Sequence, residues 1–150
     1  MKAVAFRADG ELDAVEVMDL PAPTPGEGEA VVRVRAAALN HLDIWVRKGR
    51  PGMESPMPHV LGSDAAGVVE AVGPCVEGVK PGDEVVLNPG ISCGRCEFCR
   101  RGEQSLCRDF EIVGATRPGT FAEMVAVPAE NLYPKPEHLC FVEAAALPLV

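Results

Sequence analysis

Short stretches of the chain alternate between hydrophobic and polar residues, with the period of two that is typical of half-buried β-strands. In residues 31–36, Val32, Val34 and Ala36 share one face, and Val31 lies on the other face with two arginines. An Asp-Gly pair between the first two apolar runs predicts a hairpin turn. Further strands are predicted at residues 2–7, 12–18, 67–72, 84–87 and 121–127. The pattern therefore predicts a mainly β fold built from short antiparallel strands.

Two stretches have helical spacing instead. Apolar residues around Trp45 predict a short helix that packs Trp45 into the core and ends at Gly49. Residues 141–147 predict the opening of a second helix, and the sequence ends soon afterwards in an apolar stretch without a cap. Residues 51–58 are rich in proline and predict a loop. We expect residues 1–127 to form one domain and residues 128–150 to connect it to a domain that follows.

Composition and charge narrow the class of protein. The chain has 150 residues, of which 47% are hydrophobic and 24% charged, and its mean hydropathy is +0.10. Such a chain can bury a core, so it is not disordered as a whole. The net charge of -8 argues against binding to nucleic acid or to anionic membranes. With no apolar run of about 20 residues and no signal peptide, we expect a cytoplasmic protein.

Most of the cysteines are clustered. Four of the six lie within fifteen positions, at Cys93, Cys96, Cys99 and Cys107. This C-x2-C-x2-C-x7-C spacing lets tight turns bring four thiolates together around one zinc ion, and four protein ligands make the site structural. An iron–sulfur cluster is the alternative, but its bacterial motif has a last gap of three followed by proline. Here Arg108 follows the last cysteine, so zinc is favoured. Cys75 and Cys140 stand alone and are expected to be buried thiols.

A second group of polar residues lies near the first predicted helix. Asn40 immediately precedes this helix and Asp43 follows three positions later, as in a capping box. Alternatively, the helix N-terminus opens onto a cleft and favours an electron-rich ligand there. The residues alone leave both possibilities open. Ser63 and Asp64 look like an ordinary turn, but they open a segment whose glycines indicate close approach of strands or of a ligand.

The order of these motifs resembles a known family. Residues 62–86, the cysteine lobe at residues 93–107 and residues 119–132 are similar, in this order, to zinc-containing alcohol dehydrogenases of the medium-chain dehydrogenase/reductase superfamily. The resemblance covers nearly the whole chain. It implies a GroES-like, partly open β-barrel with short helices and a structural zinc lobe. In the family a Rossmann domain for NAD(P)H follows, so residues 128–150 would lead into that domain.

The sequence departs from this family at the catalytic zinc. The family binds this ion with a cysteine, a histidine and usually a second cysteine. The matching positions hold Asn40, Ser63 and, less securely aligned, Leu149. The hydroxyl that relays protons in alcohol oxidation falls at Leu42, which has none. These residues cannot form a tight zinc site. The combination resembles the quinone oxidoreductase branch, whose members often carry Asn-x-x-Asp at the first position.

The resemblance implies a set of functional residues. Without a catalytic metal, hydrogen-bond donors must stabilise a developing oxyanion, and Asn40 and Ser63 are the candidates. Asp43 would orient them, Asp64 completes the candidate catalytic set, and His41 could face the cofactor. The predicted reaction is NAD(P)H-dependent hydride transfer to a quinone, enone or carbonyl compound, with one structural zinc.

Two other functions stay open from the sequence. One is an alcohol dehydrogenase that binds a catalytic zinc through other residues, and the other is a non-enzymatic module stabilised by zinc. A small-molecule substrate and a homo-oligomer are expected, without nucleic-acid or membrane partners. We expect the 150-residue chain to be inactive alone, because it lacks the glycine-rich dinucleotide fingerprint.

Overall fold

The computed structural model describes residues 1–49 and 55–149, and its first sheet is formed by the N-terminal hairpin. Strand β1 (Lys2–Phe6) pairs with β2 (Val15–Asp19) on one side and with β4 (His59–Val60) on the other. The hairpin confirms the turn predicted around the Asp-Gly pair. The predicted second strand was too long, because its first three residues form a 3-10 helix, η1 (Leu12–Ala14).

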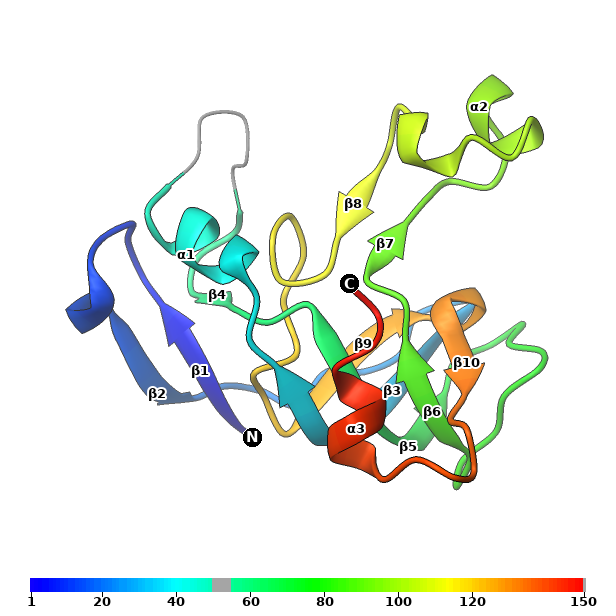
Figure 1. Cartoon of the computed structure of the whole chain (residues 1–150), viewed down its shortest axis with the longest axis horizontal. Coiled ribbons are helices and arrows are strands. Elements are labelled where there is room, and N and C mark those ends of the chain that lie inside the picture. Colours follow the sequence, from blue (N-terminus) through cyan, green and yellow to red (C-terminus); the bar gives the residue numbers. More distant parts are fainter. Residues whose placement is uncertain (50–54, 150) are drawn as a thin grey trace.

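The second sheet has five strands in the order β10-β6-β5-β3-β9. Figure 1 shows this sheet in the lower half of the molecule. Its members are β3 (Glu29–Ala38), β5 (Asp64–Val72), β6 (Glu84–Leu87), β9 (Met124–Pro128) and β10 (Leu132–Pro134). Every pairing between strands in the described residues is antiparallel, as predicted.

Backbone hydrogen bonds join the two sheets along the chain that leads into β9. The amide of Val4 donates to the carbonyl of Phe121 over 2.7 Å, and Glu123 donates to Lys2 over 3.0 Å. The predicted strand at residues 121–127 therefore exists in part: its first residues border β1, and only from Met124 does the chain join β3. The two sheets are thus joined along this part of the chain, and each has its own cluster of buried apolar residues.

The pairing of β3 is irregular. Pairing between β3 and β5 shifts register between Val31 and Val32, and again between Val34 and Ala36. Val32 packs in one core cluster with Ala30 and Val34, as the alternation predicted, whereas Val31 is outside this cluster. Val31 and Val32 are nevertheless both buried, at 2% exposure each, so both faces of the strand are covered at this point.

Hydrophobic side chains of the five-stranded sheet pack into core clusters with residues of neighbouring segments. The largest cluster combines buried residues of these strands with Ile91, Val113 and Ala129 from the neighbouring segments: Ala30, Val32, Val69, Val85, Leu87, Ile91, Val113, Val125, Val127, Ala129 and Leu132. A separate cluster places α3 (Phe141–Ala145) on the sheet, where Ala144 and Ala145 pack against Ala66 of β5. Small side chains on both partners allow this close packing of helix and sheet.

The cysteine lobe extends away from the sheets, as Figure 1 shows at the upper right. Its base is a short hairpin of β7 (Gly90–Ile91) and β8 (Glu111–Ile112). Between these strands lie the single helical turn α2 (Glu97–Arg100) and the 3-10 helix η2 (Gln104–Leu106). A third 3-10 helix, η3 (Ala129–Asn131), links β9 to β10.

Helix α1 (His41–Arg47) lies where it was predicted. Three residues that were predicted to be buried are exposed: Trp45 on this helix, at 49%, and Cys75 and Cys140 in other parts of the chain. A seven-residue helix buries only one stripe, and Val46 and Arg47 occupy that stripe here. Of the predicted loop at 51–58, residues 51–54 lie outside the described residues. No helix in the described part of the chain is long and apolar enough to cross a membrane.

Candidate functional site

Asn40 lies between the end of β3 and the start of α1, in an extended conformation. Its backbone N–H donates to Oδ2 of Asp43 over 2.7 Å, which confirms the capping role predicted for Asp43. His41 begins the helix and is exposed, and its ring lies 5.0 Å from the ring of Trp45. The predicted cofactor-facing residue and an exposed indole thus lie side by side on α1.

Asp43 connects α1 to the segment that precedes β5. Its second carboxylate oxygen, Oδ1, accepts a hydrogen bond of 3.1 Å from the backbone N–H of Gly62. The side chain is buried, and this burial raises the pKa of Asp43, while the N–H groups of Asn40 and Gly62 oppose the rise. Both oxygens therefore hold backbone atoms, so Asp43 fixes the main chain on the two sides of the site.

Asp64 is the first residue of β5 and holds the side chain of Asn40. The Nδ2 group of Asn40 donates to Oδ2 of Asp64 over 2.9 Å. Burial raises the pKa of Asp64, since the residue is 2% exposed; the bond from Asn40 opposes this rise, and the charge of Asp43 adds to it. The backbone of Leu149 also lowers the pKa of Asp64, so Leu149 lies near this carboxyl group.

Two polar atoms of this site lack hydrogen-bond partners in the described part of the chain. They are Oγ of Ser63 and Oδ1 of Asp64, and Ser63 is fully buried. The backbone at Asp64 is satisfied, because Oγ1 of Thr120 donates to its carbonyl over 2.9 Å. Ser63 and Asp64 are thus far from an ordinary surface turn. Their burial was not visible in the sequence, where only the adjacent glycines indicated close packing.

Glycines give the segment before Ser63 its tight packing. Gly62 has a φ of +94°, and a Cβ there would overlap the ring of Phe121. A Cβ on Gly114 or Gly119 would in turn overlap the backbone of Gly62. Sequence reasoning identified the first of these glycines but missed the other two, which come from a distant part of the chain.

The family's catalytic zinc does not fit the residues that the fold brings together here. Asn40, Ser63 and Asp64 offer an amide, a hydroxyl and a carboxylate, and Leu149 offers only an aliphatic side chain. A tight zinc site needs thiolate or imidazole ligands in addition to oxygen. In residues 1–49 and 55–149, the one group of three or more cysteine, histidine or acidic side chains suited to a metal is elsewhere.

That group is the predicted one, Cys93, Cys96, Cys99 and Cys107. All four sulfur atoms lie within 4.8 Å of one another. The sulfur of Cys99 is 3.5 Å from that of Cys96 and 4.0 Å from that of Cys93. Tetrahedral ligands at about 2.3 Å from zinc are separated by about 3.8 Å, so the four thiols fit a structural zinc ion.

Backbone N–H groups in the lobe favour thiolates. The N–H of Cys99 is the main cause that lowers the pKa of Cys96 to about 6, and the N–H of Arg95 lowers the pKa of Cys93. The N–H of Cys93 donates to the sulfur of Cys107 over 3.3 Å and lowers its pKa, but desolvation and the neighbouring thiols of Cys93 and Cys99 outweigh it and raise the pKa of Cys107 to about 11. The N–H groups at Cys93 and Cys96 would stabilise these two thiolates as ligands.

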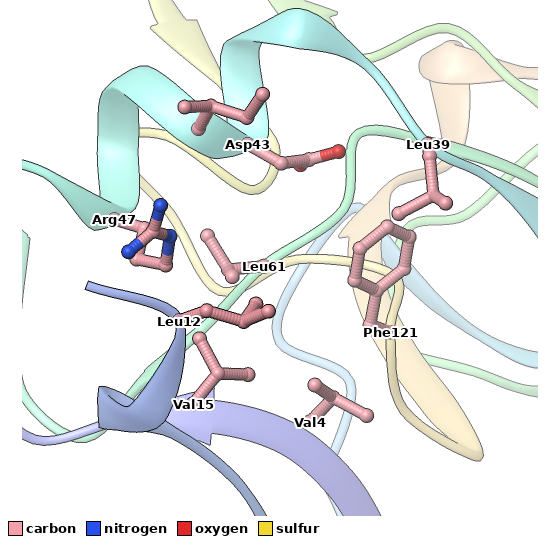
Figure 2. Close-up of a pocket in the computed structure, with 9 residues that line it drawn as sticks. Val4, Leu12, Val15, Leu39, Asp43, Arg47, Leu61 and Phe121 are labelled. Atoms are coloured by element: carbon pink, nitrogen blue, oxygen red, sulfur yellow. The ribbon is translucent and has the colours of Figure 1, made fainter.

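An apolar pocket of about 420 Å³ adjoins the site on the side of Asp43. Figure 2 shows side chains from α1, from the N-terminal hairpin and from the chain before β9 converging on it. It is lined by Val4, Leu12, Val15, Leu39, Asp43, Ile44, Arg47, Leu61 and Phe121. Asn40, Ser63 and Asp64 are not in this lining, so Asp43 is the site residue that touches the pocket. Its apolar surroundings explain the raised pKa of Asp43.

The chain is similar to a known protein family, to characterised relatives and to solved structures. Residues 26–137 match the family described as alcohol dehydrogenase GroES-like domain. The L-threonine 3-dehydrogenase of Pyrococcus abyssi is 34% identical over 140 residues, which cover 92% of this chain and 40% of the relative. A crystal structure of an NAD-dependent alcohol dehydrogenase is 60% identical, with a TM-score of 0.95, over 99% of this chain and 43% of that one.

A structure of a cobalt- and zinc-bound thermostable alcohol dehydrogenase from Pyrobaculum aerophilum is also similar. It is 39% identical, with a TM-score of 0.88, over 99% of this chain and 44% of that one. The chain therefore spans less than half the length of these relatives.

Proposed function

Because this chain belongs to the family of alcohol dehydrogenase GroES-like domains, we propose that it is the catalytic domain of an oxidoreductase that transfers hydride from NAD(P)H to a quinone, enone or other carbonyl compound. The family match and the antiparallel sheets confirm the predicted mainly β, GroES-like fold. The dehydrogenase names of its relatives support oxidoreductase activity. A Rossmann domain outside this chain would bind the cofactor.

The observation that carries the choice of substrate is the donor set at the candidate site. Asn40, Ser63 and, less securely aligned, Leu149 occupy the positions at which the resemblance puts catalytic zinc ligands, and none of them is a cysteine or a histidine. In a zinc-dependent alcohol dehydrogenase, the metal stabilises the alkoxide that forms when an alcohol is oxidised near neutral pH. Reduction of a quinone or enone can instead rely on hydrogen-bond donors beside the oxygen that becomes negative. The residues at this site therefore favour quinone or enone reduction.

The nicotinamide ring, when bound, would supply the hydride. The residues of this chain would bind and orient the acceptor. Asn40 is partly buried, whereas Ser63 is fully buried, so the carboxamide of Asn40 is the more accessible donor toward a substrate oxygen. Asp43 keeps the backbone of Asn40 in place. His41 is exposed on the same helix and could contact the cofactor.

The expectation of a cytoplasmic homo-oligomer acting on a small molecule belongs to the same proposal. Its support is the acidic composition and the similarity to dehydrogenases.

The test uses the full-length enzyme. Oxidation of NADH and NADPH is followed by absorbance with a panel of quinones and enones, and the reverse reaction is followed with simple alcohols. We expect reduction to be fast, unaffected by mild chelation, and accompanied by one zinc per chain. Chelator-sensitive alcohol oxidation with two zinc ions per chain would support the zinc-dependent alcohol dehydrogenase instead. No turnover and no cofactor binding would support the non-enzymatic module.

A further inference from the structure

The orientation of the Asn40 carboxamide is controlled by a second residue. A carboxamide has an N–H₂ edge and a C=O edge, and a half turn of the group exchanges them. The partner on β5 is a carboxyl group: Oδ2 of Asp64 lies 2.9 Å from Nδ2 of Asn40. An ionised carboxylate can only accept hydrogen bonds. It therefore selects the orientation in which the N–H₂ group faces β5.

The surrounding structure fixes the positions of both Asn40 and Asp64. The backbone of Asn40 is held by Asp43 over 2.7 Å, so the residue cannot move as a whole to adapt its side chain. Asp64 is 2% exposed and begins a strand in the middle of the five-stranded sheet, so it is equally fixed. One N–H of Nδ2 is directed at Asp64, and because Asn40 is only partly buried, we expect a ligand to reach the second N–H.

We propose that Asp64 is a positioning residue: it turns the carboxamide of Asn40 so that the site presents an N–H donor to the carbonyl oxygen of the substrate. This inference rests on the proposed function and adds a preference for one class of substrate. The site offers its N–H donor to compounds whose reacting oxygen accepts a hydrogen bond, such as a quinone or enone.

Two variants of the full-length enzyme separate positioning from a purely structural role. Asp64→Asn removes the obligatory acceptor and lets the Asn40 amide adopt either orientation. We expect kcat for quinone or enone reduction to fall by about tenfold or more, up to the 10²–10³ typical of losing one such donor, with KM for NAD(P)H unchanged. Glu70→Gln is the matched control, because it is the same acid-to-amide change at the exposed end of β5. It should leave kcat unchanged.

The exchange variant Asn40→Asp/Asp64→Asn restores a complementary donor and acceptor between the two positions. It should recover most of the melting temperature lost in Asp64→Asn, but kcat should stay low, because an aspartate at position 40 offers no donor. Recovery of kcat together with the melting temperature would overturn the proposal and leave only a structural hydrogen bond. Unchanged kcat in Asp64→Asn would overturn it as well. If the unmodified enzyme reduces no carbonyl compound, the proposed function fails instead.

A spectroscopic measurement does not depend on turnover. In the spectrum of ¹⁵N-labelled full-length enzyme, the side-chain amide signal that disappears in Asn40→Asp identifies Asn40. We expect a quinone to shift the Asn40 N–H₂ signal in the unmodified enzyme. A signal that no quinone or enone shifts, in an enzyme that reduces them, would overturn the proposal even if Asp64→Asn fails to fold.

Discussion

His59 is buried without a charged partner, and this makes the protein sensitive to acid. The residue is 0% exposed on β4, its Nε2 lies 3.0 Å from the carbonyl oxygen of Gly114, and its ring meets the ring of Phe6 edge-on at 5.6 Å. Its Nδ1 has no partner among the described residues. Burial lowers the pKa of His59, and the bond to Gly114 only partly opposes this. The folded state therefore favours the neutral imidazole.

We predict that stability falls as the pH drops below about 6.5, the ordinary histidine pKa. The unfolded chain binds a proton there before the folded chain does, so the contribution of His59 is complete above that pH and is lost toward its lower folded pKa. Urea unfolding between pH 7.5 and 5 measures this. His59→Gln should flatten the slope, and the same change at the exposed His138 should keep it. A slope that His59→Gln leaves intact contradicts the prediction.

The raised pKa values of Asp43 and Asp64 act at lower pH and in the opposite sense. Each carboxyl group binds its proton more tightly in the folded state, so its contribution is complete below about pH 4, near the ordinary pKa, and declines as the pH rises. The loss caused by His59 therefore begins above the range in which these two groups titrate in the unfolded chain.

Replacing Asn40 by alanine tests its two roles together. The change removes the donor proposed to act on the substrate, and we expect kcat to fall by about 10²–10³. It also leaves the buried Asp64 without its donor, which should destabilise the fold by about 1–3 kcal/mol. Kinetics and thermal unfolding of the same variant separate these effects. Lost stability with turnover close to that of the unmodified enzyme would reduce Asn40 to a structural role.

At the scale of elements, the site depends on how closely β3 and β5 approach each other. Gly67 on β5 has no room for a side chain, since a Cβ there would overlap the carbonyl of Arg33 on β3. The same pair of strands ends at Ala38 and begins at Asp64, which places Asn40 against Asp64. The glycine-rich segment was predicted to allow such close contact, and Gly67 confirms this.

Gly67→Ala should therefore force the two strands apart. We expect a loss of about 1–3 kcal/mol, as for other insertions into packed regions, measured by chemical unfolding. Gly26→Ala is the matched control, because its Cβ would meet only the end of the Glu29 side chain, at 3.1 Å. Equal effects of the two variants would show that strand separation is not the cause.

At the scale of the whole molecule, the cysteine lobe is tied to the sheets at its base. Nδ2 of Asn131, next to β10, donates to the carbonyls of Asn88 over 2.9 Å and Gly90 over 2.8 Å. Farther out, the lobe has short elements and surface ion pairs such as Arg108 with Glu97, which contribute little. The metal ion is therefore expected to hold the outer part of the lobe together.

We predict one zinc per chain, no iron, and strong destabilisation of the lobe when the ion is removed. Structural zinc contributes on the order of 10 kcal/mol of apparent binding free energy. Cys96→Ser should lower the melting temperature and zinc content together, whereas Cys75→Ser, at an exposed cysteine outside the lobe, should change neither. Metal analysis and calorimetry give both readouts. A brown, iron-containing sample would mean an iron–sulfur cluster.

The sequence by itself determined the features that depend on neighbours within a few residues. The spacing of Cys93, Cys96 and Cys99 places their sulfurs together because tight turns bridge two-residue gaps. Local interactions also explain the bond from the Asn40 backbone to Asp43 and the end of α1 at Arg47, shortly before Gly49 with its φ of +74°. Strand β6 has the bounds that its apolar run predicted.

Only the tertiary structure decided the features that join distant segments. Asn40 and Asp64 are 24 positions apart, and their hydrogen bond depends on the register of β3 and β5. Val31 is buried although it lies outside the cluster that holds Val32, and the packing around α1 left Trp45 exposed. A sequence pattern records the period of one strand or helix, but which face meets a neighbour depends on pairing, and pairing is set by the whole assembled core.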